Sequence, residues 1–82
     1  MEVIFELYGV LEHLAGGPER RLTLADTTSS VGAALQALAA AVPAIDAHLQ
    51  HCACAADGQV IRRTESLPPS GRIALLPPVG GG

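Results

Sequence analysis

The residues best suited to chemistry stand at the end of the chain, which reads LLPPVGGG over residues 75–82. A carboxylate is a poor electrophile until one of its oxygens has been converted into a good leaving group. Glycine has no Cβ, so both faces of an activated Gly82 carbonyl would be open to attack, and Gly81 could thread a narrow channel in conformations that other residues avoid. The ending therefore predicts a reactive acyl end at Gly82 that other proteins activate.

The residues before these glycines are stiff and apolar. Proline fixes φ at about −65°, so Pro77 and Pro78 are expected to project the tail outward and to keep it from folding back onto the domain. Extended residues 77–82 would reach roughly 20 Å at about 3.3 Å each, which is enough to enter a buried site in a second protein. We expect the hydrophobic run from Leu76 to Val79, with the adjoining sheet surface, to contact that partner.

A second group of reactive side chains, His48, His51, Cys52 and Cys54, lies within seven residues. Imidazole and thiolate are zinc ligands, but structural zinc sites usually combine two pairs of ligands, and this chain has a single C-x-C unit. On a strand, C-x-C places both side chains on one face. The segment is therefore interpreted as two small, partly buried thiols after a polar loop, with no metal site. A persulfide store on one of the cysteines is the less favoured interpretation.

The charged residues are scattered along the predicted strands. Arg20-Arg21 and Arg62-Arg63 are interpreted as solvated strand ends, with contact to an acidic partner as the alternative. Glu2, Glu6 and Glu12 are expected to contribute to an acidic surface that faces basic rims on partners. No Ser-His-Asp set or pair of carboxylates suited to catalysis is recognisable, so the chain is not expected to be a catalyst alone.

Composition narrows the class of protein. The chain has 82 residues, which fits one domain, and a formal net charge of −3, and Phe5 and Tyr8 are its only aromatic residues. Nucleic-acid binding is not expected, because phosphates select clusters of basic residues and single strands stack on aromatic rings. Lysine is absent, so no side-chain amine is available for isopeptide chains of the protein with itself.

Neither a membrane span nor an export signal is expected. The first residues, MEVIFELYGV, contain no basic region and no small-residue cleavage site. The longest aliphatic stretch, VGAALQALAAAVPAI, is broken by Gln36 and Pro43 and falls short of the ~20 apolar residues that cross a bilayer. The expected location is the cytoplasm.

The elements that position the tail follow from hydrophobic periodicity, in which alternation predicts strands and steps of three and four residues predict a helix. In chain order these are a strand over 2–8, a helical turn over 9–17, a strand over 20–25, a helix over 31–42, a hairpin over 52–61 with an Asp57-Gly58 turn, and a strand over 72–77. DTTSS (26–30) offers N-cap candidates for the helix, and Pro43 ends it. The residues between the helix and the hairpin, and residues 64–71, are expected to be loops.

This order predicts the fold class. A hairpin followed by a crossover helix and further strands gives an α+β domain, with one mixed sheet and one long helix packed on one face. Val3, Phe5 and Leu7 are expected to share the inner face of the first strand, and Pro77 to stop the last strand because it has no N–H to donate. We expect residues 1–76 to form the domain and residues 77–82 to form a flexible diglycine tail.

The element order and the ending together resemble the MoaD/ThiS family of sulfur carriers, which have the ubiquitin-like β-grasp fold, and within it the small subunit of molybdopterin synthase. The resemblance covers essentially the whole chain, through YGVLEHLAG, SSVGAALQALA, ADGQVI and RIALLPPVGGG. Members typically end in two aromatic or aliphatic residues, Pro-Pro-Val, a small residue and Gly-Gly. These places are taken here by Leu75-Leu76, Pro77-Pro78-Val79, Gly80 and Gly81-Gly82. Leu75-Leu76 stand where the molybdopterin group often has aromatic residues.

The resemblance implies a sulfur carrier that is not catalytic alone. An E1-like adenylating enzyme would use Mg-ATP to convert the Gly82 carboxylate into an acyl-adenylate, and sulfur would then replace AMP to give a thiocarboxylate. The tail from Leu75 to Gly81 would bind the partners. The chain itself would hold no permanent cofactor, because ATP and Mg are used by the activating enzyme. The sulfur would pass to the large subunit of molybdopterin synthase, or to another sulfur-accepting enzyme.

Three other functions stay open. The sulfur could serve another pathway, whose product is thiamin, cysteine or a thiolated metabolite. The same tail chemistry would suit a ubiquitin-like modifier that forms isopeptide bonds with lysines of other proteins. Finally, the domain could be a binding module whose tail is inert.

Overall fold

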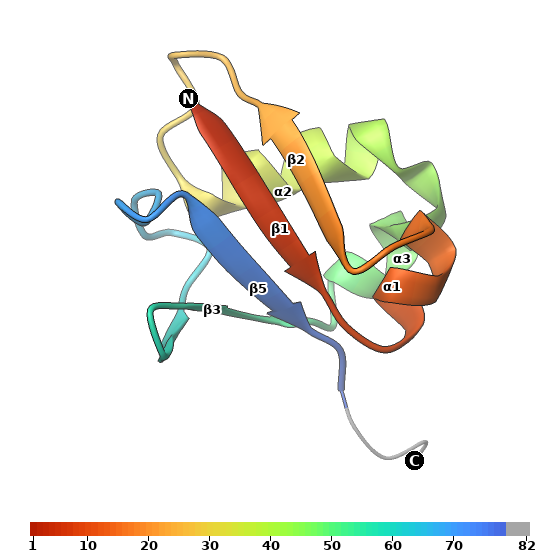
Figure 1. Cartoon of the computed structure of the whole chain (residues 1–82). Helices are drawn as coiled ribbons and strands as arrows, with labels where there is room; N and C mark the ends of the chain where they lie inside the picture. Colours follow the sequence, from red (N-terminus) through yellow and green to blue (C-terminus); the bar gives the residue numbers. More distant parts are fainter. Residues whose placement is uncertain (79–82) are drawn as a thin grey trace.

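In the computed structural model, which describes residues 1–78, five strands form one mixed sheet (Figure 1). The strand order is β2-β1-β5-β3-β4, in which β1 and β5 are parallel and the other neighbouring pairs are antiparallel. The strands are β1 (Glu2–Leu7), β2 (Glu19–Thr23), β3 (Ala53–Ala56), β4 (Gln59–Ile61) and β5 (Arg72–Leu76). The predicted α+β architecture, with a mixed sheet, is confirmed.

Within the described residues, four helical segments connect the strands, and the longest of them is the helix that the sequence predicted over residues 31–42. The segments are α1 (Val10–Ala15), α2 (Val31–Ala41), the 3-10 turn η1 (Pro43–Ile45) and α3 (Asp46–Leu49). In α2 the buried side chains, Val31, Ala34, Leu35 and Leu38, recur at steps of three and four residues. The hydroxyl oxygen of Ser30 accepts a hydrogen bond from the Ala33 N–H at 3.1 Å, so the last residue of DTTSS is the N-cap.

The segment between α2 and β3 differs from the prediction, because residues expected as a loop form η1 and α3. Pro43 ends α2 but also starts η1, since proline suits a first helical position, where the backbone N–H has no partner to lose. Ile45 and Leu49 then reach the core. Among residues 1–78 no single helix is long and apolar enough to cross a membrane; Val31–Ala41 and Pro43–Leu49 meet that test only as a pair, across a bend of 118°.

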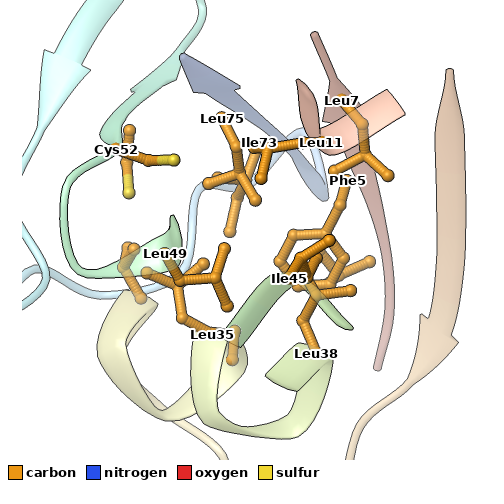
Figure 2. Close-up of a cluster of buried hydrophobic side chains, with 14 of the residues drawn as sticks. Phe5, Leu7, Leu11, Leu35, Leu38, Ile45, Leu49, Cys52, Ile73 and Leu75 are labelled. Carbon is orange, nitrogen blue, oxygen red and sulfur yellow. The ribbon is translucent and has the colours of Figure 1, made fainter. Parts of the chain in front are cut away.

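The hydrophobic core lies between the sheet and the helices (Figure 2). Phe5 from β1, Leu38 from α2 and Ile73 from β5 are all completely buried, and Ile45 packs among them. The inner face of β1 predicted by alternation is confirmed, since Val3, Phe5 and Leu7 belong to this core. The central strands β1 and β5 are therefore held both by their neighbours in the sheet and by the helical layer.

Candidate functional site

The stem of the tail leaves the domain from the middle of the sheet (Figure 1). Strand β5 lies between β1 and β3, with Leu75 opposite Leu7 on one side and Leu76 opposite Ala53 on the other. The strand ends at Leu76, directly before Pro77, as predicted. Because β5 is hydrogen-bonded to a neighbouring strand on both sides, it is a firm support for the stem.

The structure separates the residues that were predicted to form the partner-binding tail. Leu75 is completely buried, so its assignment to that tail is corrected: it faces the core because alternation along β5 puts odd-numbered residues inward. Its neighbour Leu76 faces outward and is 39% exposed. Pro77 is half-buried and Pro78 is exposed. The predicted site residues Val79, Gly80, Gly81 and Gly82 lie outside the described residues.

An apolar hollow adjoins the stem. It is lined by six residues that we call the tail base: Tyr8, Gly9, Val10, Leu76, Pro77 and Pro78. Within it the large hydrophobic side chains of Tyr8 and Val10 are 46% and 40% exposed. Exposed apolar side chains that cluster together are typical of a surface where another protein binds.

Sequence reasoning missed Tyr8 and Val10 as members of this site. They follow β1, whereas the stem follows β5, and the two segments are almost seventy positions apart in the chain. The parallel pairing of β1 with β5 brings the carboxyl ends of both strands to the same edge of the sheet. The strand order of the resembled fold was the one signal that could have placed Tyr8 beside Leu76.

The chemistry available at the tail base is binding. Its side chains are aliphatic, proline or phenol, and no carboxylate, imidazole, thiol or guanidinium is part of its lining. Such a surface can bury apolar area against a partner and hold the stem in one direction, and the Tyr8 phenol is the one side chain in its lining that could exchange a proton.

The open face of the sheet carries ion pairs, not the acidic surface that was predicted. The Arg72 guanidinium lies 2.8 Å from the Glu6 carboxylate and 2.7 Å from that of Glu19, and Arg21 lies 3.1 Å from Glu2. Hydrogen bonds to Glu6 and then to Glu19 raise the pKa of Arg72 above its ordinary value. Two of the three glutamates expected to form an acidic surface, Glu2 and Glu6, are thus neutralised by arginines from neighbouring strands.

The cysteine–histidine segment, which consists of His48, His51, Cys52 and Cys54, is arranged for packing. Both thiols are buried on one side of the sheet, as C-x-C predicted, and both histidines are exposed. The Cys52 thiol donates a hydrogen bond to the His48 carbonyl at 3.2 Å. Within residues 1–78, no three His, Cys, Asp or Glu side chains come together in a way that could hold a metal ion.

The electrostatics of this segment also disfavour thiol reactivity. Burial raises the pKa of the Cys54 thiol, and burial followed by the charge of Cys54 raises that of Cys52, while the nearby Arg63 acts in the opposite direction in both cases. Since a thiolate is the reactive form of cysteine, these thiols are poor nucleophiles at neutral pH. Arg63 itself donates hydrogen bonds to the carbonyl oxygens of Leu49 and Cys52, so the interpretation of Arg62-Arg63 as a merely solvated strand end is wrong at Arg63.

Comparison with protein families gives a match over nearly the whole chain: the model of the ThiS family matches residues 5–82. A search of curated protein sequences found no match.

Comparison with solved structures gives matches of the same kind. The small archaeal modifier protein 1 (SAMP1) of Haloferax volcanii is 28% identical with a TM-score of 0.85, and the match covers 100% of both chains. A protein described as a putative molybdopterin converting factor subunit 1 from Pyrococcus furiosus is 16% identical with a TM-score of 0.81, over 96% of this chain and 99% of that one. A chain from the complex of subunits 1 and 2 of the molybdopterin-converting factor of Helicobacter pylori is 23% identical with a TM-score of 0.68, over 100% of both chains. The predicted ubiquitin-like β-grasp fold is thereby confirmed.

Proposed function

Since this chain belongs to the ThiS family, we propose that it carries sulfur as a thiocarboxylate on Gly82 and donates it in molybdenum cofactor biosynthesis. The observation that supports the proposal most strongly is the geometry of the tail base. A rigid proline stem follows a central strand and stands beside an exposed apolar hollow, in a chain whose sequence continues to Gly82. A stem of this kind suits a reaction in which other proteins work on the end of the chain.

The proposed chemistry has two steps. A Gly82 carboxylate oxygen attacks the α-phosphorus of Mg-ATP on an E1-like adenylating enzyme, which forms the acyl-adenylate and releases pyrophosphate. Hydrosulfide, supplied by a sulfur donor, then attacks the carbonyl carbon, and AMP leaves with the electron pair of the broken C–O bond. The product is a Gly82 thiocarboxylate. Neither step changes an oxidation state, so no redox partner is needed.

This chain's own part in those steps is to present its end. The tail base would bury its exposed Tyr8, Val10 and Leu76 side chains against the partner while the tail enters the partner's site. ATP and Mg would be bound by the activating enzyme and not by this domain. The lining of the tail base is mainly apolar, and we propose that the chain is a sulfur-donating subunit or co-substrate and not a catalyst alone.

The proposed acceptor is the large subunit of a molybdopterin synthase. The related chain from Helicobacter pylori is solved in a complex of subunits 1 and 2, and we propose a partner of the subunit 2 type for this chain as well. In such a pair the exposed apolar tail base would form the rim of the entrance through which the tail passes. An Arg substitution at Val79 is expected to weaken this complex, because it places a charge inside the apolar contact.

The direct test is sulfur incorporation. The chain is incubated with its E1-like enzyme, ATP and sulfide, and its intact mass is measured. We expect a gain equal to the exchange of one oxygen for one sulfur, and no gain when ATP is omitted. The charged chain is then mixed with the large subunit and the pterin precursor, where loss of the sulfur from the chain is expected. No gain in the first reaction would count against every sulfur-carrier function.

The second reaction separates the possible pathways. A chain that gains sulfur but does not pass it to a pterin precursor would point to another acceptor, with thiamin, cysteine or a thiolated metabolite as the product. Incubation of the charged chain with extracts that contain each biosynthetic enzyme, followed by intact mass, would identify which one removes the sulfur.

A second candidate function is that of a ubiquitin-like protein modifier. The observation that favours it is the 28% identity, over the full length of both chains, to the small archaeal modifier protein 1. An activated Gly82 would then be attacked by a lysine amine of a target protein, and an isopeptide bond would form as AMP or sulfide leaves. Recovery of tagged chain from cells, followed by a search for lysines that carry glycine remnants, tests this function. The absence of lysine in this chain predicts adducts with other proteins but no chains of itself through lysine.

A further inference from the structure

The turn between β1 and α1 has a backbone shape that glycine alone adopts with ease. Gly9 has φ 57° and ψ −128°, which is the mirror image of the extended region of ordinary residues. A Cβ built on Gly9 would stand 3.3 Å from the Cγ atom of Pro77. Carbon atoms prefer separations of about 3.5–4.0 Å, so a side chain at this position would push against the proline ring. Two independent features, the backbone conformation and the contact with Pro77, therefore disfavour a side chain at Gly9.

The domain fixes the position of Gly9 without help from the tail. Gly9 is the N-cap of α1, and its carbonyl accepts a hydrogen bond from the His13 N–H at 3.3 Å. The Tyr8 carbonyl accepts one from the Leu11 N–H at 3.1 Å, and the Leu11 side chain is completely buried. N-cap positions usually favour Ser, Asp or Asn, whose side chains satisfy a free N–H of the first turn. Here the place next to that N-cap is taken by the Pro77 ring.

The stem is also fixed by the strand from which it leaves, β5. Leu75 is buried in the core, Leu76 is the last residue of β5, and Pro77 has a restricted φ of its own. The Pro77 ring is thus held between the end of β5 and the start of α1, and both Gly9 and Pro77 belong to the lining of the apolar hollow. The contact joins the two segments that the parallel pairing of β1 and β5 brings together.

We infer that Gly9 is a positioning residue for the tail: because it lacks a side chain, it lets the Pro77 ring seat against the start of α1, and this sets the direction of the Pro77-Pro78 stem. The consequence for activity rests on the proposed function. A partner must accept the domain and the tail together, and a stem that already points correctly lowers the entropy lost on binding. Loss of the seat should therefore weaken recognition of the carrier, while leaving the reactive carboxylate unchanged.

The first experiment is the kinetics of Gly9→Ala with the E1-like enzyme. We expect the KM for the carrier to rise about tenfold while kcat stays within about twofold, because the substitution removes binding that is the same in the ground and transition states. Gly16→Ala is the matched control at the other end of α1. Gly16 also has a positive φ, of 82°, but a Cβ there meets nothing within 4 Å. Its KM is expected to equal that of the wild type.

A double-mutant cycle with Pro77→Ala separates the contact from the backbone strain. Alanine lacks the Cγ atom that would be crowded, whereas the backbone cost of Gly9→Ala is the same in both backgrounds. Pro77→Ala is expected to raise KM by itself. In its presence Gly9→Ala should raise KM further by less than about twofold. If Gly9→Ala raised KM by the same factor in both backgrounds, the inference would be overturned.

A measurement on the wild-type chain keeps the inference testable even if Gly9→Ala does not fold. The contact predicts a nuclear Overhauser effect between the α protons of Gly9 and the γ protons of Pro77. Its absence in an otherwise assigned spectrum would overturn the inference. The same measurement distinguishes this inference from the proposed function. A wild-type chain that shows the effect but gains no sulfur would support the contact between Gly9 and Pro77 and contradict the sulfur-carrier function.

Discussion

The tail base and the cysteine–histidine segment form a contrasting pair. The tail base contains no reactive side chain apart from the Tyr8 phenol, yet its apolar side chains are exposed beside the stem. The other segment contains two thiols and two imidazoles, yet Cys52 and Cys54 are only 4% and 1% exposed. Judged by residue types alone, the second segment is the more promising site. Judged by what a partner can touch, the tail base is.

The difference shows that the density of reactive groups and their accessibility to a partner point to different parts of this molecule. A small β-grasp core has room for buried thiols as packing residues, and burial raises their pKa values, which keeps them protonated and inert. In the proposed function, the carrier has to expose its one reactive group to several enzymes. The central strand β5 and the prolines after it would serve that purpose without a catalytic side chain of their own.

The largest effect is expected from removal of Gly81-Gly82. Sulfur incorporation should be lost completely, because the reactive carboxylate would move to Gly80, too close to the stem to reach the adenylation site. The fold should be retained, since the core of residues 1–78 contains neither glycine. Intact mass after incubation with the E1-like enzyme measures the first expectation, and circular dichroism measures the second. A truncated chain that still works in the cell would support the inert-tail binding module in place of the carrier.

Leu75 and Leu76 offer the next largest effect, as a matched pair of neighbours on β5. Leu75→Ala should lower the free energy of unfolding by about 2–5 kcal/mol, because it leaves a cavity in the core. Leu76→Ala should lower it by less than about 1 kcal/mol, but should weaken binding of the large-subunit partner about tenfold. Denaturant unfolding and calorimetric titration measure the two quantities. Equal losses of stability would mean that the outward face of β5 has been assigned wrongly.

The buried thiols predict a pH dependence of stability. Burial raises the pKa of Cys54 above its ordinary value of 9.0, so the folded state keeps a proton that the unfolded chain releases. The contribution to stability is therefore fully present below pH 9.0 and is lost as the pH rises from there through the folded-state pKa. The slope per thiol cannot exceed about 1.4 kcal/mol per pH unit. Denaturant unfolding of wild type and Cys54→Ala on both sides of this window checks it: the variant should show the shallower decline, and parallel curves would contradict the burial of this thiol.

The smallest effect is expected at Arg63. Arg63→Met keeps the aliphatic stem of the side chain but removes the hydrogen bonds to the carbonyls of Leu49 and Cys52, which should cost about 0.5–1.5 kcal/mol of stability. Sulfur incorporation should be unchanged, because these bonds lie outside the tail base. Arg62→Met is the control, since the Arg62 side chain makes no hydrogen bond within residues 1–78. If Arg62→Met destabilised the chain as much, the role assigned to the Arg63 guanidinium would be refuted.

Much of the fold could be predicted because the sequence features that indicate it involve residues close together in the chain. Alternation in β1, the N-cap at Ser30 and the turn at Asp57-Gly58 each depend on residues within a few positions of one another. The short helix α3 was missed for the corresponding reason, since four residues are too few to show a helical period. Of the site, the stem was predicted, whereas the assignment of Leu75 to the tail was wrong, because alternation along β5 turns this side chain into the core.

The sequence by itself determined the candidate reactive end, the stiff stem before it and the periodicities that build one sheet and one long helix, because each of these is a property of neighbouring residues. Only the tertiary structure decided which side chains surround the stem. Tyr8 and Gly9 stand beside Leu76 and Pro77 because β1 and β5 pair in parallel, and Glu6 and Glu19 meet Arg72 across three strands. Such contacts join residues far apart in the chain, and their energies depend on burial and distance, which no local pattern contains.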